Sequence, residues 1–158
     1  MIFRYVIMIN FYAALEPGKE LVPFEYDPGE LQDHEVEIDV HCCGICHSDQ
    51  SVIDNDWEMT QYPVVPGHEV VGTIARAGEH VKNMTVGQVV GLGWHSGYCN
   101  ECAYCLCGDQ NLCADSQATV IGHHGGFADR VRAAANSVVP IPEGMDLESA
   151  GPLFCGGI

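Results

Sequence analysis

Short alternations of apolar and polar residues run through the chain and predict strands rather than long helices. The clearest alternation covers residues 35–43, where the apolar side chains fall on one face and the acids Glu37 and Asp39 on the other. A period of two is typical of a strand that is buried on one side only. We therefore expect a half-buried strand here, with both acids turned to solvent.

Similar signals predict a series of further short elements. Eighteen glycines and eight prolines in 158 residues indicate many turns, so the fold class expected is mainly β, in a chain long enough for one core. Residues 10–15 and 21–26 form a candidate hairpin around Pro17-Gly18. The remaining expected elements are strands at residues 69–77, 88–92, 127–133 and 137–141, and short helices at residues 46–53 and 146–153, the latter with Asp146 as N-cap.

The first nine residues, MIFRYVIMI, are apolar but too few to span a bilayer, which takes about 20 residues. They are either an N-terminal extension or a strand, and an alternative start at Met8 would make the first seven an upstream artefact. We expect the domain itself to cover residues 10–158. Within it, residues 97–114 stand apart, because they hold five cysteines and little hydrophobic periodicity.

The charge balance is strongly acidic, with 22 acidic residues against 6 basic ones and a net charge of −16. Nucleic-acid phosphates and anionic membranes would repel such a surface, so we expect neither as a partner. We interpret the acidity as an aid to solubility. No apolar stretch reaches the roughly 18 residues of a membrane span, and no secretory signal is visible. The expected location is the cytoplasm.

Nine cysteines cannot all pair as disulfides, and in a reducing compartment metal binding or catalysis is the more common role. Four of them have the spacing C-x2-C-x2-C-x7-C, which is typical of a closed tetrahedral zinc site: Cys99, Cys102, Cys105 and Cys113. Such a site has no open position, so its expected role is structural, coupled to folding of the lobe at residues 97–114. Three alternatives stay open: Cys107 in place of Cys105, an iron–sulfur cluster, and a disulfide framework.

A second set of ligand types is spread along the chain. Cys46 and His68 supply two ligands and Cys155 is a candidate third. Two cysteines and one histidine leave the fourth position of a zinc ion open, the arrangement of a catalytic site. An open zinc lowers the pKa of bound water from about 15.7 to about 7, and it activates an alcohol in the same way.

Residues beside these ligands carry matching chemistry. Ser48 is placed to accept the alcohol proton, and Asp49 to orient a ligand histidine through its other ring nitrogen. Taken singly, each residue is weak evidence. Cys46 alone could be a small core residue. His68 alone could be a hydrogen-bonded loop histidine, and Glu69 alone a solvated charge.

The combined pattern resembles the zinc-containing alcohol dehydrogenases. Gly67-His68-Glu69-x2-Gly72-x5-Gly78-x2-Val81 matches the signature of that family. Residues 43–49 resemble its catalytic-cysteine segment, residues 99–113 its structural-zinc lobe, and residues 151–157 the segment with its third catalytic ligand. The segments stand in the family's order and cover nearly all of the chain from residue 10, and they are most similar to the cinnamyl-alcohol-dehydrogenase-like branch.

The resemblance implies a GroES-like β-barrel catalytic domain with an inserted structural-zinc lobe and two zinc ions per chain. The resemblance implies that Cys46, His68 and Cys155 bind the catalytic zinc and that Glu69 approaches the metal during ligand exchange. It implies that Ser48 hydrogen-bonds the substrate oxygen and passes on its proton, and that Asp49 braces His68. It places His47 beside the cofactor pyrophosphate, and Trp57 and Trp94 in the substrate pocket. For the two tryptophans a core position is the alternative. Ser51 stands where many members of the family carry a histidine, which leaves the outer step of the proton relay open.

A cofactor-binding fingerprint is missing from the sequence. No G-x-G-x-x-G occurs, and the run of residues 122–126, GHHGG, neither matches it nor has the βαβ setting. The resemblance implies NAD or NADP on a Rossmann domain that would follow Ile158 and is absent from this chain. We therefore expect a fragment, a split-gene product or a truncated form that is inactive alone.

The expected function is zinc-dependent interconversion of a primary alcohol and its aldehyde with hydride transfer to NAD(P), by a full-length form that is a homo-oligomer. The alternative from another class is a truncated, non-catalytic zinc-binding module. Within the enzymes, a zinc-free quinone reductase and the sorbitol or threonine dehydrogenases are the rivals.

Overall fold

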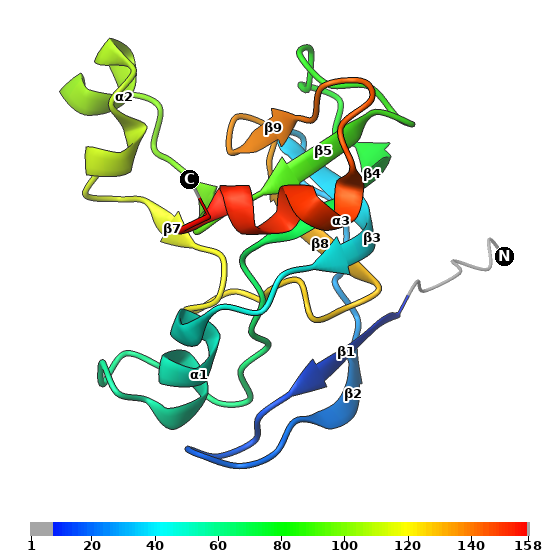
Figure 1. Cartoon of the computed structure of the whole chain (residues 1–158). Helices are drawn as coiled ribbons and strands as arrows, with labels where there is room; N and C mark the ends of the chain where they lie inside the picture. The colour runs from blue at the N-terminus through cyan, green and yellow to red at the C-terminus, as the bar shows by residue number, and fades with distance from the viewer. Residues whose placement is uncertain (1–7, 158) are drawn as a thin grey trace, which may run out of the picture.

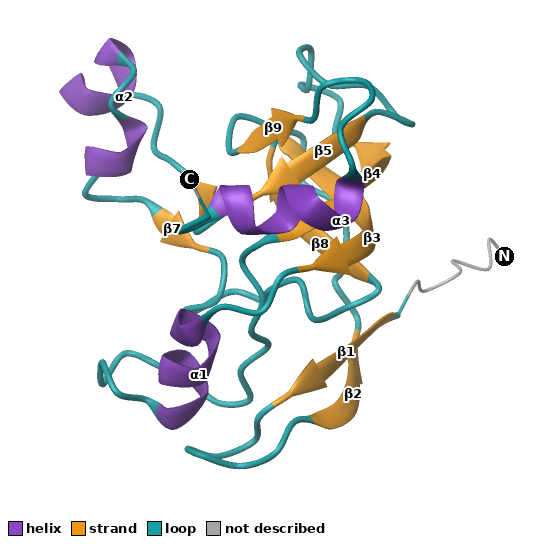
Figure 2. Ribbon diagram, in the orientation of Figure 1, coloured by secondary structure: helices purple, strands orange, loops and turns teal. Residues whose placement is uncertain are grey.

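A five-stranded sheet forms the centre of the computed structural model, which describes residues 8–157 (Figure 1). Its strand order is β8-β3-β4-β5-β9, and every neighbouring pair is antiparallel. The strands are β3 (Glu35–Cys43), β4 (Val70–Ala77), β5 (Val89–Leu92), β8 (Arg130–Ala134) and β9 (Val138–Pro140). Residues 8–157 therefore contain no parallel sheet of the kind that binds dinucleotides, and the mainly β fold class is confirmed (Figure 2).

The predicted hairpin is present below this sheet. β1 (Ile9–Ala13) and β2 (Val22–Tyr26) pair antiparallel, with Phe11 opposite Phe24. A single bridge from Phe11 to Ala128 joins the hairpin to the segment before β8, so β8 starts later than the sequence predicts. Of the N-terminal stretch at residues 1–9, Ile9 belongs to β1, and residues 1–7 lie outside the described part of the chain.

Strand β3 covers the predicted residues, but the expectation that Glu37 faces solvent is wrong. Its side chain is 0% exposed. The guanidinium of Arg132 lies 2.8 Å from the Glu37 carboxylate, that of Arg130 3.1 Å and that of Arg76 3.6 Å. Three of the six basic residues of the chain thus surround one carboxylate. The local alternation could not reveal this, because the arginines come from strands that are distant in sequence.

Three groups of apolar side chains hold the elements together. The largest lies against the five-stranded sheet and includes Ile38, Ile74 and Leu92. A second group attaches helix α1 (His47–Asp54) through Val52 and Ile53. The third lies under the hairpin β1-β2. Helix α1 is therefore attached to the core by its second half, and the exposed His47 marks its first position.

The cysteine-rich segment projects from the sheet as a separate lobe (Figure 1). It contains helix α2 (Ala103–Cys107) and the 3-10 turn η1 (Gln110–Leu112), and its base is the short pair β6 (His95–Gly97) and β7 (Gln117–Ala118). The sequence pattern predicted none of these four elements. No helix in residues 8–157 is both long and apolar enough to cross a membrane.

The chain returns across the sheet at its C-terminal end. The predicted helix at residues 146–153 is α3 (Leu147–Ala150) followed by the 3-10 helix η2 (Gly151–Phe154). Asp146 is the N-cap, as predicted, and its carboxylate accepts from the backbone N–H of Ser149. Pro152 near the start of η2 explains the change of helix type, since proline donates no backbone hydrogen bond.

Candidate metal centres and substrate cleft

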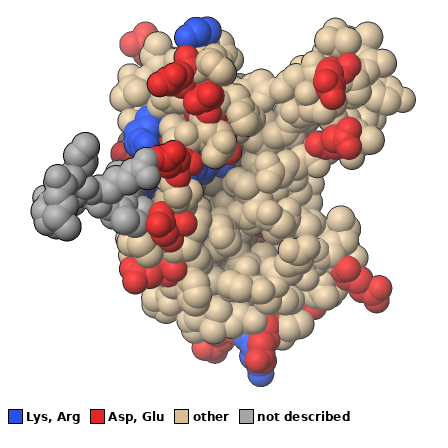
Figure 3. Space-filling view, turned by 180° about the vertical axis from the view of Figure 1, so that it is seen from behind, with Lys and Arg blue, Asp and Glu red and all other residues tan. Residues whose placement is uncertain are grey.

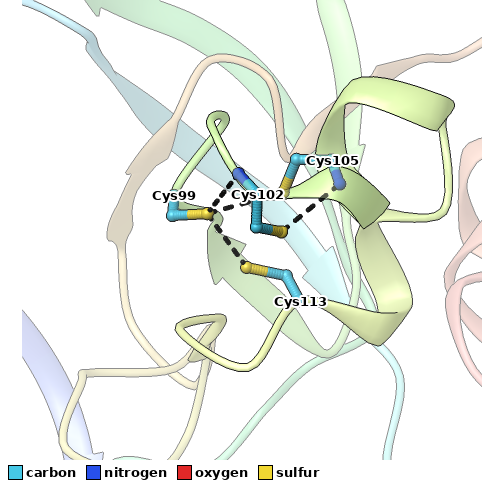
Figure 4. Close-up of side chains that lie close together, drawn as sticks. All are labelled: Cys99, Cys102, Cys105 and Cys113. Carbon is cyan, nitrogen blue, oxygen red and sulfur yellow. Dashed lines mark hydrogen bonds between the residues drawn. The ribbon is translucent and has the colours of Figure 1, made fainter.

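Four cysteines converge inside the lobe (Figure 4). The sulfur atoms of Cys99, Cys102, Cys105 and Cys113 all lie within 4.8 Å of one another. Cys99 Sγ lies 3.5 Å from Cys113 Sγ and 3.8 Å from Cys105 Sγ. Cys107 is exposed and lies outside the group. All nine cysteines are free thiols, so the geometry gives no support to a disulfide framework or to Cys107 as the fourth member.

Backbone donors point at these sulfur atoms. The N–H of Cys102 lies 3.4 Å from Cys99 Sγ, and the N–H of Cys105 lies 3.5 Å from Cys102 Sγ. The N–H groups of Glu101 and Cys102 lower the pKa of Cys99 to about 7, whereas burial raises the pKa of Cys105 to about 12. Donors directed at a thiolate stabilise the form that binds metal, so the backbone favours this form at Cys99.

A second group lies where α1, β4 and the C-terminal end of η2 meet. It consists of Cys46, His68, Glu69 and Cys155, whose ligand atoms also lie within 4.8 Å of one another. His68 Nε2 is 3.3 Å from Cys155 Sγ, and Cys46 Sγ is 3.7 Å from Cys155 Sγ. The three candidate catalytic ligands are thus brought together although Cys46 and Cys155 are 109 residues apart in the sequence.

Asp49 connects the parts of this group. It is 2% exposed, and its Oδ1 accepts from the backbone N–H of Gly67 at 2.8 Å and lies 3.0 Å from His68 Nδ1. Its Oδ2 accepts from the N–H of Cys46 at 2.9 Å. A carboxylate only accepts, so Nδ1 of His68 carries the proton and the lone pair of Nε2 faces the two sulfur atoms.

The local charges act on each ligand differently. Burial alone would lower the pKa of His68, but the hydrogen bond and charge of Asp49 and the adjacent Cys46 raise it. The backbone N–H of Ser48 lowers the pKa of Cys46. Burial and the neighbouring Cys46 raise the pKa of Cys155. The thiol of Cys46 is therefore more easily ionised than the thiol of Cys155.

The position of Cys155 is fixed although it lies near the end of the described chain. Its backbone N–H donates to the carbonyl of Pro152 at 3.1 Å. The ring of the preceding Phe154 occupies the space above Gly91, where a side chain on the glycine would overlap it. Leu153 is exposed. Packing of Phe154 on β5 therefore holds the third candidate ligand.

Glycine is required at a second place beside the group. A Cβ on Gly44 would overlap the carboxylate of Glu69, and the Gly44 N–H donates to the Glu69 carbonyl at 3.0 Å. The absent side chain lets a nearly buried carboxylate reach the three ligands. Sequence inspection did not single out Gly44, although its place two residues before Cys46 offered a signal.

The remaining predicted residues occupy the rim. His47 is exposed at the first position of α1, and Ser48 is half-buried beside the sulfur of Cys46. Ser51, which stands at the outer relay position, is 6% exposed.

The two tryptophans meet in a cleft beside the second group. Their rings lie edge to face at 5.7 Å, and the Trp94 ring lies 5.0 Å from the ring of His68. The cleft has a volume of about 700 Å³. Figure 3 shows the surface hollowed on this side, between the lobe and the part that contains α1. Trp57 is 42% exposed, so a core position does not describe it.

Comparison with known proteins gives a consistent result. Residues 32–143 match the alcohol dehydrogenase GroES-like domain. An aldehyde reductase from Synechocystis is 62% identical over 151 residues, which are 96% of this chain and 45% of that protein. The chain thus spans less than half the length of this relative.

Solved structures agree with this. A cinnamyl alcohol dehydrogenase from Sorghum bicolor has a TM-score of 0.90 and 36% identity, with 96% of this chain and 45% of that chain covered. A cinnamyl alcohol dehydrogenase from Helicobacter pylori, complexed with NADP(H), has a TM-score of 0.89 and 28% identity, with 96% and 46% covered. The predicted resemblance and GroES-like fold are confirmed, and the chain belongs to the alcohol dehydrogenase family through its GroES-like domain.

Proposed function

We propose that this chain is the metal-binding catalytic part of an NAD(P)-linked oxidoreductase that interconverts a primary alcohol and its aldehyde. The observation that carries the proposal is the convergence of Cys46, His68 and Cys155 beside the cleft that contains Trp94. Two thiols and one imidazole are the donor set of catalytic zinc sites with an open position. The name of the relative from Synechocystis, an aldehyde reductase, supports the same chemistry.

The residues present fit a zinc ion at each group. Four sulfur donors suit a closed site without an open position, whereas the Cys₂His group would leave one position for a substrate oxygen. A zinc ion held there supplies a Lewis acid that polarises this oxygen. Asp49 fixes the tautomer of His68 that presents Nε2, as carboxylates behind ligand histidines do.

The side chains around the open position divide the remaining work. Ser48 accepts a hydrogen bond from the substrate hydroxyl and, as it takes up that proton, passes its own proton on to water. Glu69, which is 5% exposed and whose carboxylate lies within 4.8 Å of the three ligand atoms, would offer an oxygen to a bound zinc ion during ligand exchange. Trp57 and Trp94 exclude water and hold the apolar part of the substrate. His47 on the exposed rim contacts the cofactor pyrophosphate.

The nicotinamide cofactor supplies the hydride acceptor or donor. The sequence contains no G-x-G-x-x-G fingerprint, and the structure described for residues 8–157 contains only antiparallel sheet pairings. We infer that residues 10–158 are the catalytic domain, with residues 97–114 as its structural lobe. We expect these 158 residues alone not to turn over alcohol.

The test is a fusion of this chain to the C-terminal part of the aldehyde reductase from Synechocystis. We expect the fusion to oxidise benzyl alcohol with NADP, the chain alone to be inactive, and Ser48→Ala in the fusion to lower kcat by about 10²-fold or more, the usual contribution of proton transfer. A folded fusion with two zinc ions and no alcohol or aldehyde turnover would refute the proposed reaction. Turnover by the chain alone would refute the need for a second domain.

A further inference from the structure

The cleft beside the second metal group has two walls of different origin. The first is apolar and follows α1 and β5: Trp57, Met59 and Trp94. The second wall is the segment of residues 115–118, which leads out of the cysteine lobe. Cys113 lies two residues before this segment. One wall of the cleft is therefore continuous with a candidate ligand of the other metal centre.

The base of the lobe joins the two walls by few hydrogen bonds. β6 and β7 pair His95 with Ala118 and Gly97 with Gln117. The next residue, Thr119, donates its N–H to the carbonyl of Trp94 at 2.8 Å and its hydroxyl to the carbonyl of Gly93 at 2.6 Å. The backbone of Trp94 is thus bonded directly to the strand that leaves the lobe.

Little besides the cysteines holds the lobe itself. Its apolar side chains Tyr104, Leu106 and Leu112 are 50%, 74% and 54% exposed. Among residues 98–116 only Cys105 and Cys113 are buried. A contact between the side chains of Asn100 and Asn136 joins the lobe to the sheet. A segment without a core keeps one conformation only when a cross-link or a metal closes it.

We propose that the four-cysteine centre is a positioning device for the substrate cleft: a metal ion closed by Cys99, Cys102, Cys105 and Cys113 fixes residues 115–118 against Trp94. This inference rests on the proposed function, because it assumes that the cleft binds the substrate and that the metal is zinc. The Cys46–His68–Cys155 group is held separately, by Asp49 and by Phe154. Loss of the lobe metal therefore opens the cleft and leaves the second metal group assembled.

The test uses the zinc-loaded 158-residue chain and its intrinsic fluorescence. Trp57 and Trp94 are the only tryptophans, and both line the cleft, so acrylamide quenching reports on the cleft alone. We expect Cys113→Ser to lose one zinc ion and to raise the quenching constant roughly twofold, because metal binding and local folding are coupled. The control is Cys107→Ser, an exposed thiol of the same lobe, which keeps both zinc ions and the parental quenching.

A second readout separates this effect from general unfolding. After cobalt replaces zinc, the visible spectrum of the Cys₂His group is expected to be the same in Cys113→Ser as in the parent. A Cys113→Ser protein that loses one zinc ion but keeps the parental quenching overturns the proposal. If Cys113→Ser does not fold, Cys102→Ser decides by the same readouts, because Cys102 is a half-buried member of the same group. We expect one zinc ion with raised quenching, whereas one zinc ion with unchanged quenching overturns the proposal. A parent chain that binds no zinc at the four cysteines overturns it too, and with it the assignment of that centre under the proposed function.

Discussion

Replacing Asp49 by asparagine is the sharpest test of how the Cys₂His group is organised. The carboxylate accepts from three donors, the N–H groups of Cys46 and Gly67 and the Nδ1–H of His68. An amide has one acceptor oxygen, and its NH₂ group faces a donor wherever the oxygen is placed. At least one buried donor therefore loses its acceptor.

The magnitude follows from this count. An unsatisfied buried donor costs about 1–3 kcal/mol. Loss of a carboxylate behind a ligand histidine lowers metal affinity about 10- to 100-fold, which is about 1.4–2.8 kcal/mol. We expect Asp49→Asn to weaken zinc binding at the Cys₂His group by this factor and to leave the four-cysteine centre unchanged.

The assay is zinc competition with a chromophoric chelator, which resolves the two centres because only one is altered. Asp54→Asn is the matched control, since Asp54 is an exposed acid at the other end of the same helix, where a substitution changes stability by less than about 0.5 kcal/mol. Equal zinc affinity in Asp49→Asn and Asp54→Asn would refute the bracing role.

Three further outcomes follow from the structure. Gly44→Ala is expected to displace the Glu69 carboxylate, because the new Cβ would overlap it, and so to slow zinc exchange, measured by transfer to a chelator; an unchanged exchange rate would contradict the role of Glu69. Glu37→Gln removes the carboxylate that Arg76 and Arg132 face and leaves Arg130 only its pair with Asp39. It should lower the free energy of unfolding in urea by about 3 kcal/mol, the low end for a broken buried pair, since two of the arginines are partly in water; a loss below about 1 kcal/mol would show that the cluster is dispensable. Burial lowers the pKa of His124 in the folded chain. Near the ordinary histidine pKa of about 6.5, the unfolded chain therefore binds a proton that the folded chain does not. The free energy of unfolding consequently falls as the pH drops through about 6.5. His124→Phe should flatten this fall between about pH 7.5 and 5.5, whereas His80→Gln, at an exposed histidine, should keep it; equal slopes would refute the assignment.

Local patterns predicted the backbone where a local cause determines it. The period of two at residues 35–43 identified β3 in full, and Asp146 identified the start of α3. Glu37 shows the limit of such patterns. Its burial depends on arginines of two other strands, and an alternation says which residues share a face but not what covers that face.

The two metal groups also differ in how far the sequence could predict them. The spacing of the four cysteines was sufficient to predict one cluster, because its members lie within one short loop. The Cys46, His68 and Cys155 group needed the family resemblance, since only the folded sheet brings such distant residues together. The contacts that hold Cys155, from Phe154 to Gly91, had no sequence signal. Neither had β6 and β7, which are short and owe their pairing to the lobe between them.

We propose that one chain holds two separate metal centres, one of which depends on Cys155. Elemental analysis of the purified 158-residue chain and of Cys155→Ser tests this. We expect two zinc ions for the parent, one for each group, and a single one for the variant. The same zinc content in both proteins would contradict it, because the Cys₂His group would then not be a metal centre of this chain.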